Sequence, residues 1–346
     1  MILQGISFIT HNGRQIPRVP TELGWADRLG GWKARWAIGR MKYSVEPGIY
    51  AVGNPDADSP VFVSANYKMS FDRLRSQLAG RDGWILVLDT KGINVWCAAG
   101  KGTFGTEELV RRIEEVRLSE IVRHKTLIVP QLGAVGVSAH KVKQQSGFSV
   151  VYGPVRAEDL PAFLDAGMKA SEEMRRVVFP LKDRVVLIPV ELVSWGKYVV
   201  LAAACFLVLA GLNPKGYSTT VAMSDGVRAV LILLIGFLSA VVLGPVLLPW
   251  LPGRPFSIKG FWIGLAVLLV GGLFLWRQTN TADGGFSRAA WVLMIPALTS
   301  FVVLNFTGAS TYTSLSGVKR EVKIAVPIQL VCAAVGIGLW LAGRFV

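Results

Sequence analysis

The sequence predicts an α/β domain built on a parallel sheet, followed by an all-α membrane domain of five transmembrane helices. Short apolar runs alternate with charged segments up to about Pro180, whereas long apolar blocks follow Lys197. Such a shift in composition marks a domain boundary. A hydrophobic content of 52% is also too high for an ordinary soluble protein. We therefore expect one domain at residues 1–167, a linker at 168–196 and the membrane domain at 197–346.

Strands and helices alternate along the first domain, after a basic leader that carries Trp25, Trp32 and Trp36. We expect strands at 60–67, 83–89, 126–130 and 148–152. Helices are expected at 70–78, 94–101, 106–122, 137–145 and 157–167. This alternation favours a parallel sheet covered on both faces, in which ligands lie beyond the carboxyl ends of the strands. The loops at those ends are 64–69, 90–94, 131–136 and 153–156.

A short helix after the second of these strands carries Cys97, the only cysteine of the first domain. Asn94 is a good N-cap residue, and counting from it puts Cys97 at the third helical position. The sulfur there lies near unpaired backbone N–H groups and the positive end of the helix dipole, which favour the metal-binding thiolate form. A small buried cysteine that fills a gap behind a strand is an equally good interpretation of the spacing alone.

Residues 100–105 match the pattern GxGxxG and precede a helix, which would suit a dinucleotide site. The match is weak, because a whole short helix separates the first glycine from the preceding strand. We interpret these glycines as a tether for the helix that carries Cys97. The sequence has no cluster of cysteine and histidine with metal-ligand spacing, so we expect any electron supply to come from a partner protein.

Five apolar blocks approach the ~20 residues needed to cross a bilayer core. They lie at 198–212, 229–250, 260–276, 289–306 and 324–342. A large buried helical core is the competing interpretation, but five such blocks in succession make it improbable. Cys205 and Cys332 fall inside apolar blocks, where we expect them to act as packing residues and not to form disulfides.

The net charge of +14 favours a solvated face beside anionic lipid. The sequence has no basic stripe interleaved with aromatic residues and no recognised binding motif, so we expect no nucleic-acid partner. The apolar run at 1–10 is too short for a signal peptide. We therefore expect a multi-pass protein of the cytoplasmic membrane with its N-terminal domain in the cytoplasm.

The octapeptide at 94–101, NVWCAAGK, resembles the signature of the mercury-methylating corrinoid protein family. The likeness extends to residues 88–92, 101–105, 130–133 and 152–156, and a five-span membrane half also fits that family. The first domain is in addition similar to the corrinoid iron–sulfur protein of the acetyl-CoA pathway, a methyl carrier. The resemblance implies a Rossmann-like domain in which a base-off, cobalamin-like corrinoid lies under a cap helix.

The activity implied by this resemblance is that of a corrinoid-dependent methyltransferase, which passes a cobalt-bound methyl group to inorganic Hg(II) and forms methylmercury. Cys97 would be the catalytic residue and the lower axial ligand of cobalt. A ferredoxin-like partner with two iron–sulfur clusters would reduce the cobalt, and a separate methyltransferase would supply the methyl group.

The resemblance also assigns roles within the cap. Asn94 would fix the first turn of the helix, and the backbone N–H groups of that turn would stabilise the sulfur anion. Ala98 and Ala99 would keep the helix thin against the corrin, and Trp96 would anchor it on the sheet. Lys101 would pair with a corrin amide or stay solvated. The other cofactor contacts that we expect are Val95 and Gly100 in the cap, and Ser64, Asn66, Thr90 and Gly133 at strand ends.

Two other functions stay open at this point. A membrane-anchored corrinoid methyl carrier of one-carbon metabolism would share the site but not the acceptor. A membrane receptor or transporter with a nucleotide-binding domain would show charged residues or interrupted helices within its spans. The spans are plain apart from Pro245, Pro296, Asn305 and Pro327.

Overall fold

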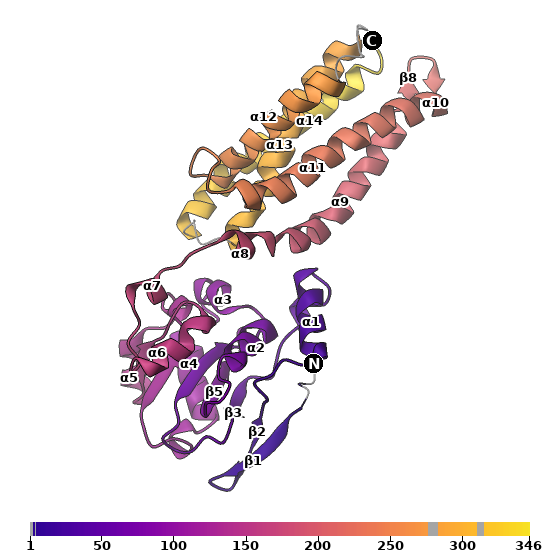
Figure 1. The fold of residues 1–346 in the computed structure, drawn as a ribbon. Helices are drawn as coiled ribbons and strands as arrows, with labels where there is room; N and C mark the ends of the chain where they lie inside the picture. The colour runs from indigo at the N-terminus through magenta and orange to yellow at the C-terminus, as the bar shows by residue number, and fades with distance from the viewer. Residues whose placement is uncertain (1–2, 4, 276–282, 310–314) are drawn as a thin grey trace. The chain divides into compact units, whose positions relative to one another are not determined.

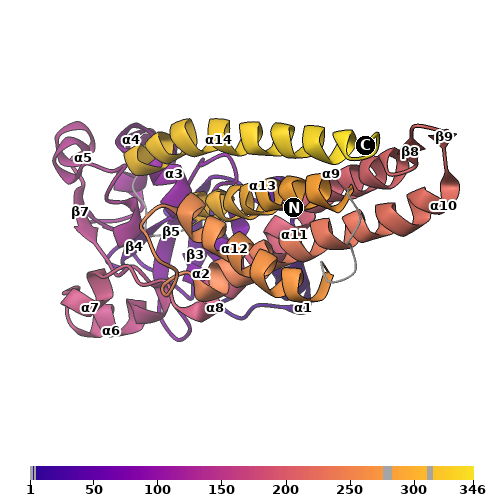
Figure 2. The same cartoon turned by 90° about the horizontal axis from the view of Figure 1, so that it is seen from above.

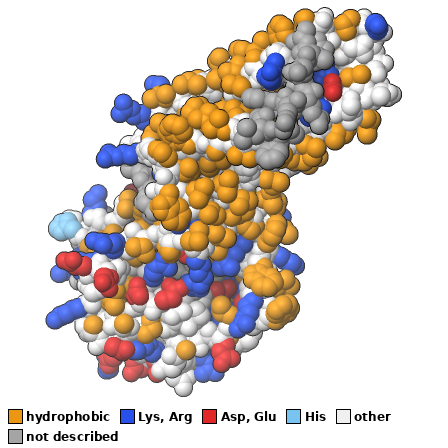
Figure 3. Space-filling model, turned by 45° about the horizontal axis from the view of Figure 1, so that its top comes forward, with side chains coloured by type: hydrophobic (Ala, Val, Ile, Leu, Met, Phe, Trp, Pro, Cys, Tyr) orange, Lys and Arg blue, Asp and Glu red, His pale blue; other side chains and the backbone are white. Residues whose placement is uncertain are grey.

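The computed structural model describes residues 3, 5–275, 283–309 and 315–346. The chain divides into two units, Met1–Val177 and Val178–Val346. Figure 1 shows the first as an α/β unit and the second as a bundle of long helices. In the view of Figure 3, hydrophobic side chains cover most of the helical unit, whereas the α/β unit shows charged side chains of both signs.

The α/β unit contains a seven-stranded sheet in the order β1-β2-β3-β5-β4-β6-β7. Its strands are β1 Ser7–His11, β2 Arg14–Arg18, β3 Gly48–Val52, β4 Val61–Ala65, β5 Gly83–Leu88, β6 Thr126–Val129 and β7 Ser149–Tyr152. Strand β4 pairs in parallel with both β5 and β6, and β6 pairs in parallel with β7. The four strands expected from the sequence therefore form a parallel sheet, as predicted.

Helices cover both faces of this sheet, as Figure 2 shows. They are α1 Trp25–Arg35, α2 Lys68–Ser76, α3 Val95–Lys101, α4 Thr106–Glu115, α5 Ala139–Ser146, α6 Leu160–Asp165 and α7 Glu172–Arg175. Short 3-10 turns are η1 Arg40–Lys42, η2 Leu118–Glu120, η3 Gln131–Gly133 and η4 Ala157–Asp159. Buried side chains form two main clusters, one under α3, α4 and α5 and the other under α2 and α6.

The central strand β5 shows why the sheet has two cores. All six of its residues are buried. Its side chains alternate, because successive residues of a strand point to opposite faces. Trp84, Leu86 and Leu88 join the cluster of α3, α4 and α5, while Ile85 and Val87 join the cluster of α2 and α6. A continuous apolar run is therefore the expected composition for this strand.

The N-terminal leader is more ordered than the sequence predicted, since it supplies three strands and the helix α1. β1 and β2 form a hairpin, and Asn12 and Gly13 at its turn both have positive φ angles, 46° and 74°. β3 then pairs antiparallel with β5. The Asn-Gly pair is a strong hairpin signal, but the strands beside it are half polar and lack a clear apolar alternation.

The helix expected at 106–122 is shorter than predicted. It ends at Glu115, and Arg117 takes a left-handed φ of 48° that α-helical geometry does not allow. Leu118, Ile121 and Val122 still reach the core, but from the turn η2 and the chain after it. The apolar periodicity therefore predicts correctly which side chains are buried, but it predicts the wrong helix length.

The second unit is helical. Its elements are α8 Leu181–Val185, α9 Ile188–Leu209, β8 Leu212–Asn213, β9 Gly216–Tyr217, α10 Thr219–Val221, the π-turn η5 Ala222–Gly226, α11 Val227–Leu247, α12 Phe256–Leu275, α13 Asp283–Asn305, η7 Phe306–Ala309 and α14 Leu315–Ala342. In the described part of the chain, four helices are long and apolar enough to cross a membrane, and the apolar helix Phe256–Gly271 is shorter. The helix α9 begins at Ile188, inside the expected linker.

The helices of this unit approach one another through glycines, and α13 is their common neighbour. A side chain at Gly264 of α12 would lie 2.3 Å from Thr299 Oγ1, and one at Gly236 of α11 would lie 2.8 Å from Ile295. On α14, Gly336 is equally close to Met294, at 2.5 Å. Small residues at such contacts are typical of membrane helices, where close backbone packing replaces the hydrophobic drive of water.

Candidate functional site

The carboxyl ends of β4, β5, β6 and β7 meet at one edge of the sheet. The chain passes from β4 to β5 on one side and then continues to β6 and β7 on the other side of β4. In open parallel sheets, ligands bind in the crevice where the strand order reverses in this way. The loop after β5 leads into α3, so the helix that carries Cys97 lies at this edge, as the sequence predicted.

The start of α3 is fixed by Asn94. This residue has an extended conformation, and its side-chain oxygen accepts a hydrogen bond of 2.9 Å from the backbone N–H of Cys97. The predicted N-cap is therefore confirmed. At the other end, Gly102 takes a left-handed φ of 82° and stops the helix after seven residues. The position of Cys97 thus depends on the N-cap at Asn94 and on the helix end at Gly102, both of which act over only a few residues.

The orientation of α3 separates its residues into two groups. Val95, Ala98 and Ala99 are buried in the core cluster of the sheet. Because an α-helix turns about 100° per residue, Cys97 and Gly100 then lie on the opposite side. Cys97 is partly exposed and Gly100 is exposed, with no atom within 4 Å of the place where its side chain would begin. The thiol therefore faces away from the sheet.

The inner side of α3 lies directly on backbone. A side chain at Gly136 would lie 2.1 Å from Phe104 O and 3.2 Å from Ala99 Cα. Gly133, at the end of η3, is similarly covered by the Phe104 ring. The small side chains of Ala98 and Ala99 thus let the helix approach the β6–α5 loop. This packing explains why both residues are small, whereas the sequence led us to expect contact with a ligand. Their contact with a cofactor stays a prediction, as does that of Gly133.

Trp96 and Lys101 complete the outer part of the cap. Trp96 is half-buried and is not part of the core cluster, so α3 is joined to the core by Val95, Ala98 and Ala99 and not by Trp96 as expected. Lys101 is exposed, in line with the solvated alternative. The surface that α3 presents outward is therefore made by Trp96, Cys97, Gly100 and Lys101.

Asn66 and Thr90 hold the loop that precedes α3. The side-chain oxygen of Asn66 accepts hydrogen bonds from the backbone N–H groups of Thr90, at 3.1 Å, and Gly92, at 2.9 Å. The Thr90 hydroxyl lies 2.6 Å from Ile93 O and 2.8 Å from the same Asn66 oxygen. Thr90 is fully buried and Asn66 is 6% exposed. Both residues were expected to contact a cofactor, and the structure gives each of them an internal positioning role.

Asp89 ends β5 and is tied on two sides. Its backbone N–H donates to Glu108 of α4 at 2.7 Å, and its carboxylate accepts from the Lys91 backbone and side chain. Burial raises the pKa of Asp89, but the hydrogen bonds and charge of Lys91 outweigh burial, so the pKa lies below its ordinary value. This role of Glu108 depends on a contact between segments that are distant in the sequence, where the local pattern indicates only a solvated helix face.

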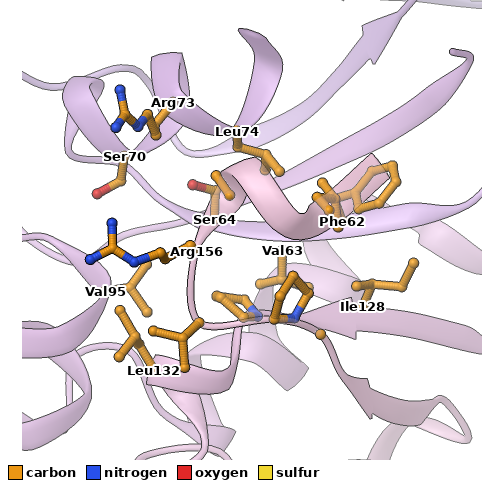
Figure 4. A pocket seen from close by; sticks show the side chains of 16 residues that line it. Phe62, Val63, Ser64, Ser70, Arg73, Leu74, Val95, Ile128, Leu132 and Arg156 are labelled. Atoms are coloured by element: carbon orange, nitrogen blue, oxygen red, sulfur yellow. The ribbon is translucent and has the colours of Figure 1, made fainter. Parts of the chain in front are cut away.

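A pocket of about 170 Å³ opens between β4, β6 and the loop after β7. Most of its lining is apolar, and Val95 of the cap and Ser64 of β4 both contribute to it. Figure 4 shows Arg73 and Arg156 at one end of the pocket and Phe62 and Ile128 at the other. The two arginines lie on separate segments, so only the folded chain brings them together. Arg73 is also ion-paired with Glu158.

Six of the expected site residues therefore fall into three pairs. Ser64 and Val95 share the pocket, Asn66 and Thr90 share the loop, and Cys97 and Gly100 share the outer face of α3. Among the described residues, no group of three or more histidine, cysteine or acidic side chains is placed to hold a metal ion.

Comparison with protein families bears on this α/β unit. Residues 37–164 match the family model of the CO dehydrogenase/acetyl-CoA synthase delta subunit. The match includes all four parallel strands, the cap helix α3 and both arginines of the pocket. It ends before the helical unit begins.

Curated relatives carry a related description but a different subunit name. The acetyl-CoA decarbonylase/synthase complex subunit gamma of Archaeoglobus fulgidus is 31% identical over 135 residues, which cover 38% of this chain and 28% of the relative. The subunit gamma of Methanopyrus kandleri is 34% identical over 128 residues, covering 36% of this chain and 27% of the relative. The chain thus spans little more than a quarter of the length of these relatives.

Proposed function

We propose that the α/β unit binds a corrinoid on the outer face of α3 and that the chain is a membrane-anchored methyl carrier of one-carbon metabolism. The observation that carries this proposal is the outward orientation of Cys97 at the switch point of a parallel sheet. The likeness of residues 37–164 to subunits of the acetyl-CoA decarbonylase/synthase system supports the one-carbon assignment. The order of the parallel strands suits a Rossmann-like domain.

The residues at α3 fit such a cofactor. A thiolate is a soft ligand suited to a transition metal, and Cys97 is accessible from outside. Gly100 leaves open space beside it. The pocket, at about 170 Å³, is smaller than the ~300 Å³ at which pockets for drug-sized ligands begin. A macrocycle would therefore lie against the helix face, and the pocket would take no more than an appendage of it.

The chain's own residues would hold and orient the group. Cys97 would ligate the cobalt, and Asn94 would fix the Cys97 backbone through the cap hydrogen bond. Asn66 and Thr90 would keep the loop before α3 in place through their hydrogen bonds, as residues that contact metal ligands from behind do. When bound, a corrinoid supplies the capacity to accept and donate a methyl group.

The methyl acceptor distinguishes two candidates. The names of the relatives concern acetyl-CoA decarbonylation and synthesis, and they favour the one-carbon carrier. Mercury methyltransferase is the second candidate, because the NVWCAAGK octapeptide carries Cys97 on the outward face of α3, where the thiol is accessible to a metal. In both cases the partners would include a methyl-donor protein and an iron–sulfur reductant; Hg(II) would be a substrate only in the second.

The helical unit would anchor this site to a bilayer. Four helices meet the length and hydropathy of a span, and we propose α12 as a fifth because its 20 residues, Phe256–Leu275, reach ~30 Å at 1.5 Å per residue. Five spans with the α/β unit in the cytoplasm would make the chain a multi-pass protein of the cytoplasmic membrane.

A visible spectrum tests the ligand assignment. The full chain is purified in detergent without oxygen, supplied with a cobalamin, and compared with Cys97→Ala and with Cys332→Ala as a thiol control. We expect a base-off spectrum with sulfur ligation in the wild type and the control, and loss of the sulfur signature in Cys97→Ala. Identical spectra for all three proteins would remove Cys97 from the ligand set, and failure of the wild type to retain cobalamin would end the proposal.

A second assay separates the acceptors. The methylated, cobalamin-loaded chain is mixed with Hg(II), and methylmercury is measured. Formation that depends on Cys97 would support the mercury methyltransferase. A chain that retains cobalamin and forms no methylmercury would leave the one-carbon carrier.

A further inference from the structure

Helix α1 buries a charged side chain and exposes three tryptophans. Asp27 is buried, whereas Trp25 at the first position of the helix, Trp32 in its last turns and Trp36 just after it are 71%, 60% and 47% exposed. These tryptophans are spaced by seven and four residues, so they lie on one face of the helix. A soluble domain rarely exposes three large aromatic side chains on one stripe without a partner for them.

The inner face of α1 holds this stripe rigidly outward. The Asp27 carboxylate contacts Lys68 Nζ at 2.5 Å and Arg75 Nη2 at 2.8 Å, both from α2 and both buried. Gly30 lies so close to the Tyr43 ring that a side chain there would be 2.6 Å from it. Because the inner face is made of a buried ion network and a close backbone approach, α1 cannot turn its tryptophans inward.

The exposed stripe continues into the chain that follows and is bordered by positive charge. Ile38 and Met41 are 60% and 71% exposed. Arg28, Lys33 and Lys42 are exposed in the same segment. We call these eight residues the α1 surface: Trp25, Arg28, Trp32, Lys33, Trp36, Ile38, Met41 and Lys42. Figure 1 shows α1 at the edge of the α/β unit, away from α5 and α6.

We propose that the α1 surface binds the anionic face of a lipid bilayer. Tryptophan is the residue enriched at headgroup depth, because its ring is apolar and its N–H is polar. Exposed lysine and arginine beside it are attracted to anionic lipid. The surface thus has both components of an interfacial membrane-binding segment, on a helix that is already folded.

The connection between the α/β unit and the apolar helices is short. Only residues 176–180 separate the last helix of the α/β unit, α7, from α8, which precedes the first apolar helix. Five extended residues span at most about 18 Å. The family match begins at residue 37, so α1 lies before the part shared with the CO dehydrogenase/acetyl-CoA synthase delta subunit. A feature that adapts the α/β unit to the helical unit is expected to lie outside the shared domain.

Binding at this surface would act on the candidate site through a direct contact. The backbone oxygen of Met41 lies 3.3 Å from the place where a side chain at Gly92 would begin. Gly92 belongs to the loop that Asn66 holds and that leads into α3. The α1 surface and the base of the cap helix are therefore parts of one packed block, and lipid binding would set the direction in which Cys97 faces relative to the bilayer plane.

Photocrosslinking in a bilayer tests the proposal. Trp32 of the full chain is replaced by a photoreactive phenylalanine derivative, and the protein is placed in nanodiscs of phosphatidylcholine with or without phosphatidylglycerol. The same replacement at Phe8, which is 65% exposed on β1, is the matched control. We expect lipid adducts at position 32, more of them with phosphatidylglycerol, and few at position 8. Adducts at position 32 to protein only, from a second copy or from the helical unit, would overturn the proposal, as would equal lipid yields at both positions.

Charge removal gives an independent readout on the same sample. Arg28→Gln with Lys33→Gln and Lys42→Gln should lower the lipid yield at position 32 about ten-fold in anionic nanodiscs. The control removes the same number of exposed positive charges elsewhere, as Lys141→Gln with Lys143→Gln and Lys169→Gln, and should leave the yield unchanged. An equal drop in both variants would show a response to net charge alone and would contradict a specific lipid-binding surface. These measurements need no cofactor, so their outcome is separate from that of the corrinoid proposal.

Discussion

At the scale of single residues, the site depends on a few positions whose roles come from backbone geometry. Asn94 fixes the first turn of α3, and Gly136 admits the helix against the loop after β6. Cys97 faces away from the sheet because Val95, Ala98 and Ala99, on the opposite side of α3, are buried in its core. The reactive position is thus set by its unreactive neighbours.

The cap hydrogen bond can be tested by removing its acceptor. Asn94→Ala should lower the local stability of α3 by about 1 kcal/mol, because the Cys97 N–H loses its partner, whereas Asn94→Asp should retain most of it. Hydrogen exchange of amides 95–101 measures the difference. Equal exchange in the alanine and aspartate variants would mean that the cap does not hold the helix.

Gly100 distinguishes a fold effect from a ligand effect. Gly100→Ala should raise the helix stability by about 0.5–1 kcal/mol, since the position is helical and nothing lies within 4 Å of it. The same methyl group should weaken cobalamin retention if the ligand lies against the outer face of α3. Thermal unfolding and cobalamin titration are measured on one preparation; unchanged retention would place the ligand elsewhere.

At the scale of secondary-structure elements, α1 and α2 are joined by buried charges. Asp27 and Asp72 alternate with Lys68 and Arg75, with contacts between 2.5 and 2.8 Å. Burial raises the pKa of Asp27, but the hydrogen bonds and charges of Lys68 and Arg75 outweigh it and hold the pKa below its ordinary value. The sequence gives no periodic signal for the contacts of Asp27, because its partners Lys68 and Arg75 are 41 and 48 residues away.

This network predicts an acid-dependent attachment of α1. A carboxyl group whose pKa is lowered by folding stabilises the fold above its ordinary pKa, and this contribution is lost as pH falls through the lowered value. Asp27→Asn should therefore cost about 3 kcal/mol near pH 7, and less as the pH falls below about 4. Hydrogen exchange of residues 25–35, measured as a function of pH, gives both the cost near pH 7 and its decrease at low pH.

Asp165→Asn is the control for this prediction. Its ion pair with Arg81 is largely exposed and should be worth no more than about 1 kcal/mol. A pH profile of residues 25–35 that is the same in wild type and Asp27→Asn would show that the network does not hold α1.

At the scale of the whole molecule, two units follow different packing rules. The α/β unit buries alternating strand side chains between two layers of helices. The helical unit exposes much of its apolar surface and packs its helices through glycine. Arg184 and Lys259 donate to carbonyl groups at and just after the C-terminal end of α11.

Two neighbouring glycines of α14 test the packing rule. Gly336→Ala should lower the free energy of unfolding by about 1–3 kcal/mol, because its methyl group would meet Met294 and Ala290 O. Gly338→Ala should be neutral or slightly stabilising, since nothing lies within 4 Å of it. Thermal unfolding in detergent compares them. Equal effects would contradict a close contact between α13 and α14.

The sequence by itself determined what local pattern encodes: four parallel strands, the N-cap at Asn94, the break before the apolar helices, and the residues that carry the likeness to corrinoid proteins. Tertiary structure alone decided which face of α3 carries Cys97, that Asn66 and Thr90 support a loop, that Arg73 and Arg156 share a pocket, and that polar edge strands extend the sheet. The physical reason is the distance along the sequence over which each interaction acts. Periodicity and capping act within a few residues, whereas strand order, burial and ion pairing are settled between segments that meet only when the chain packs.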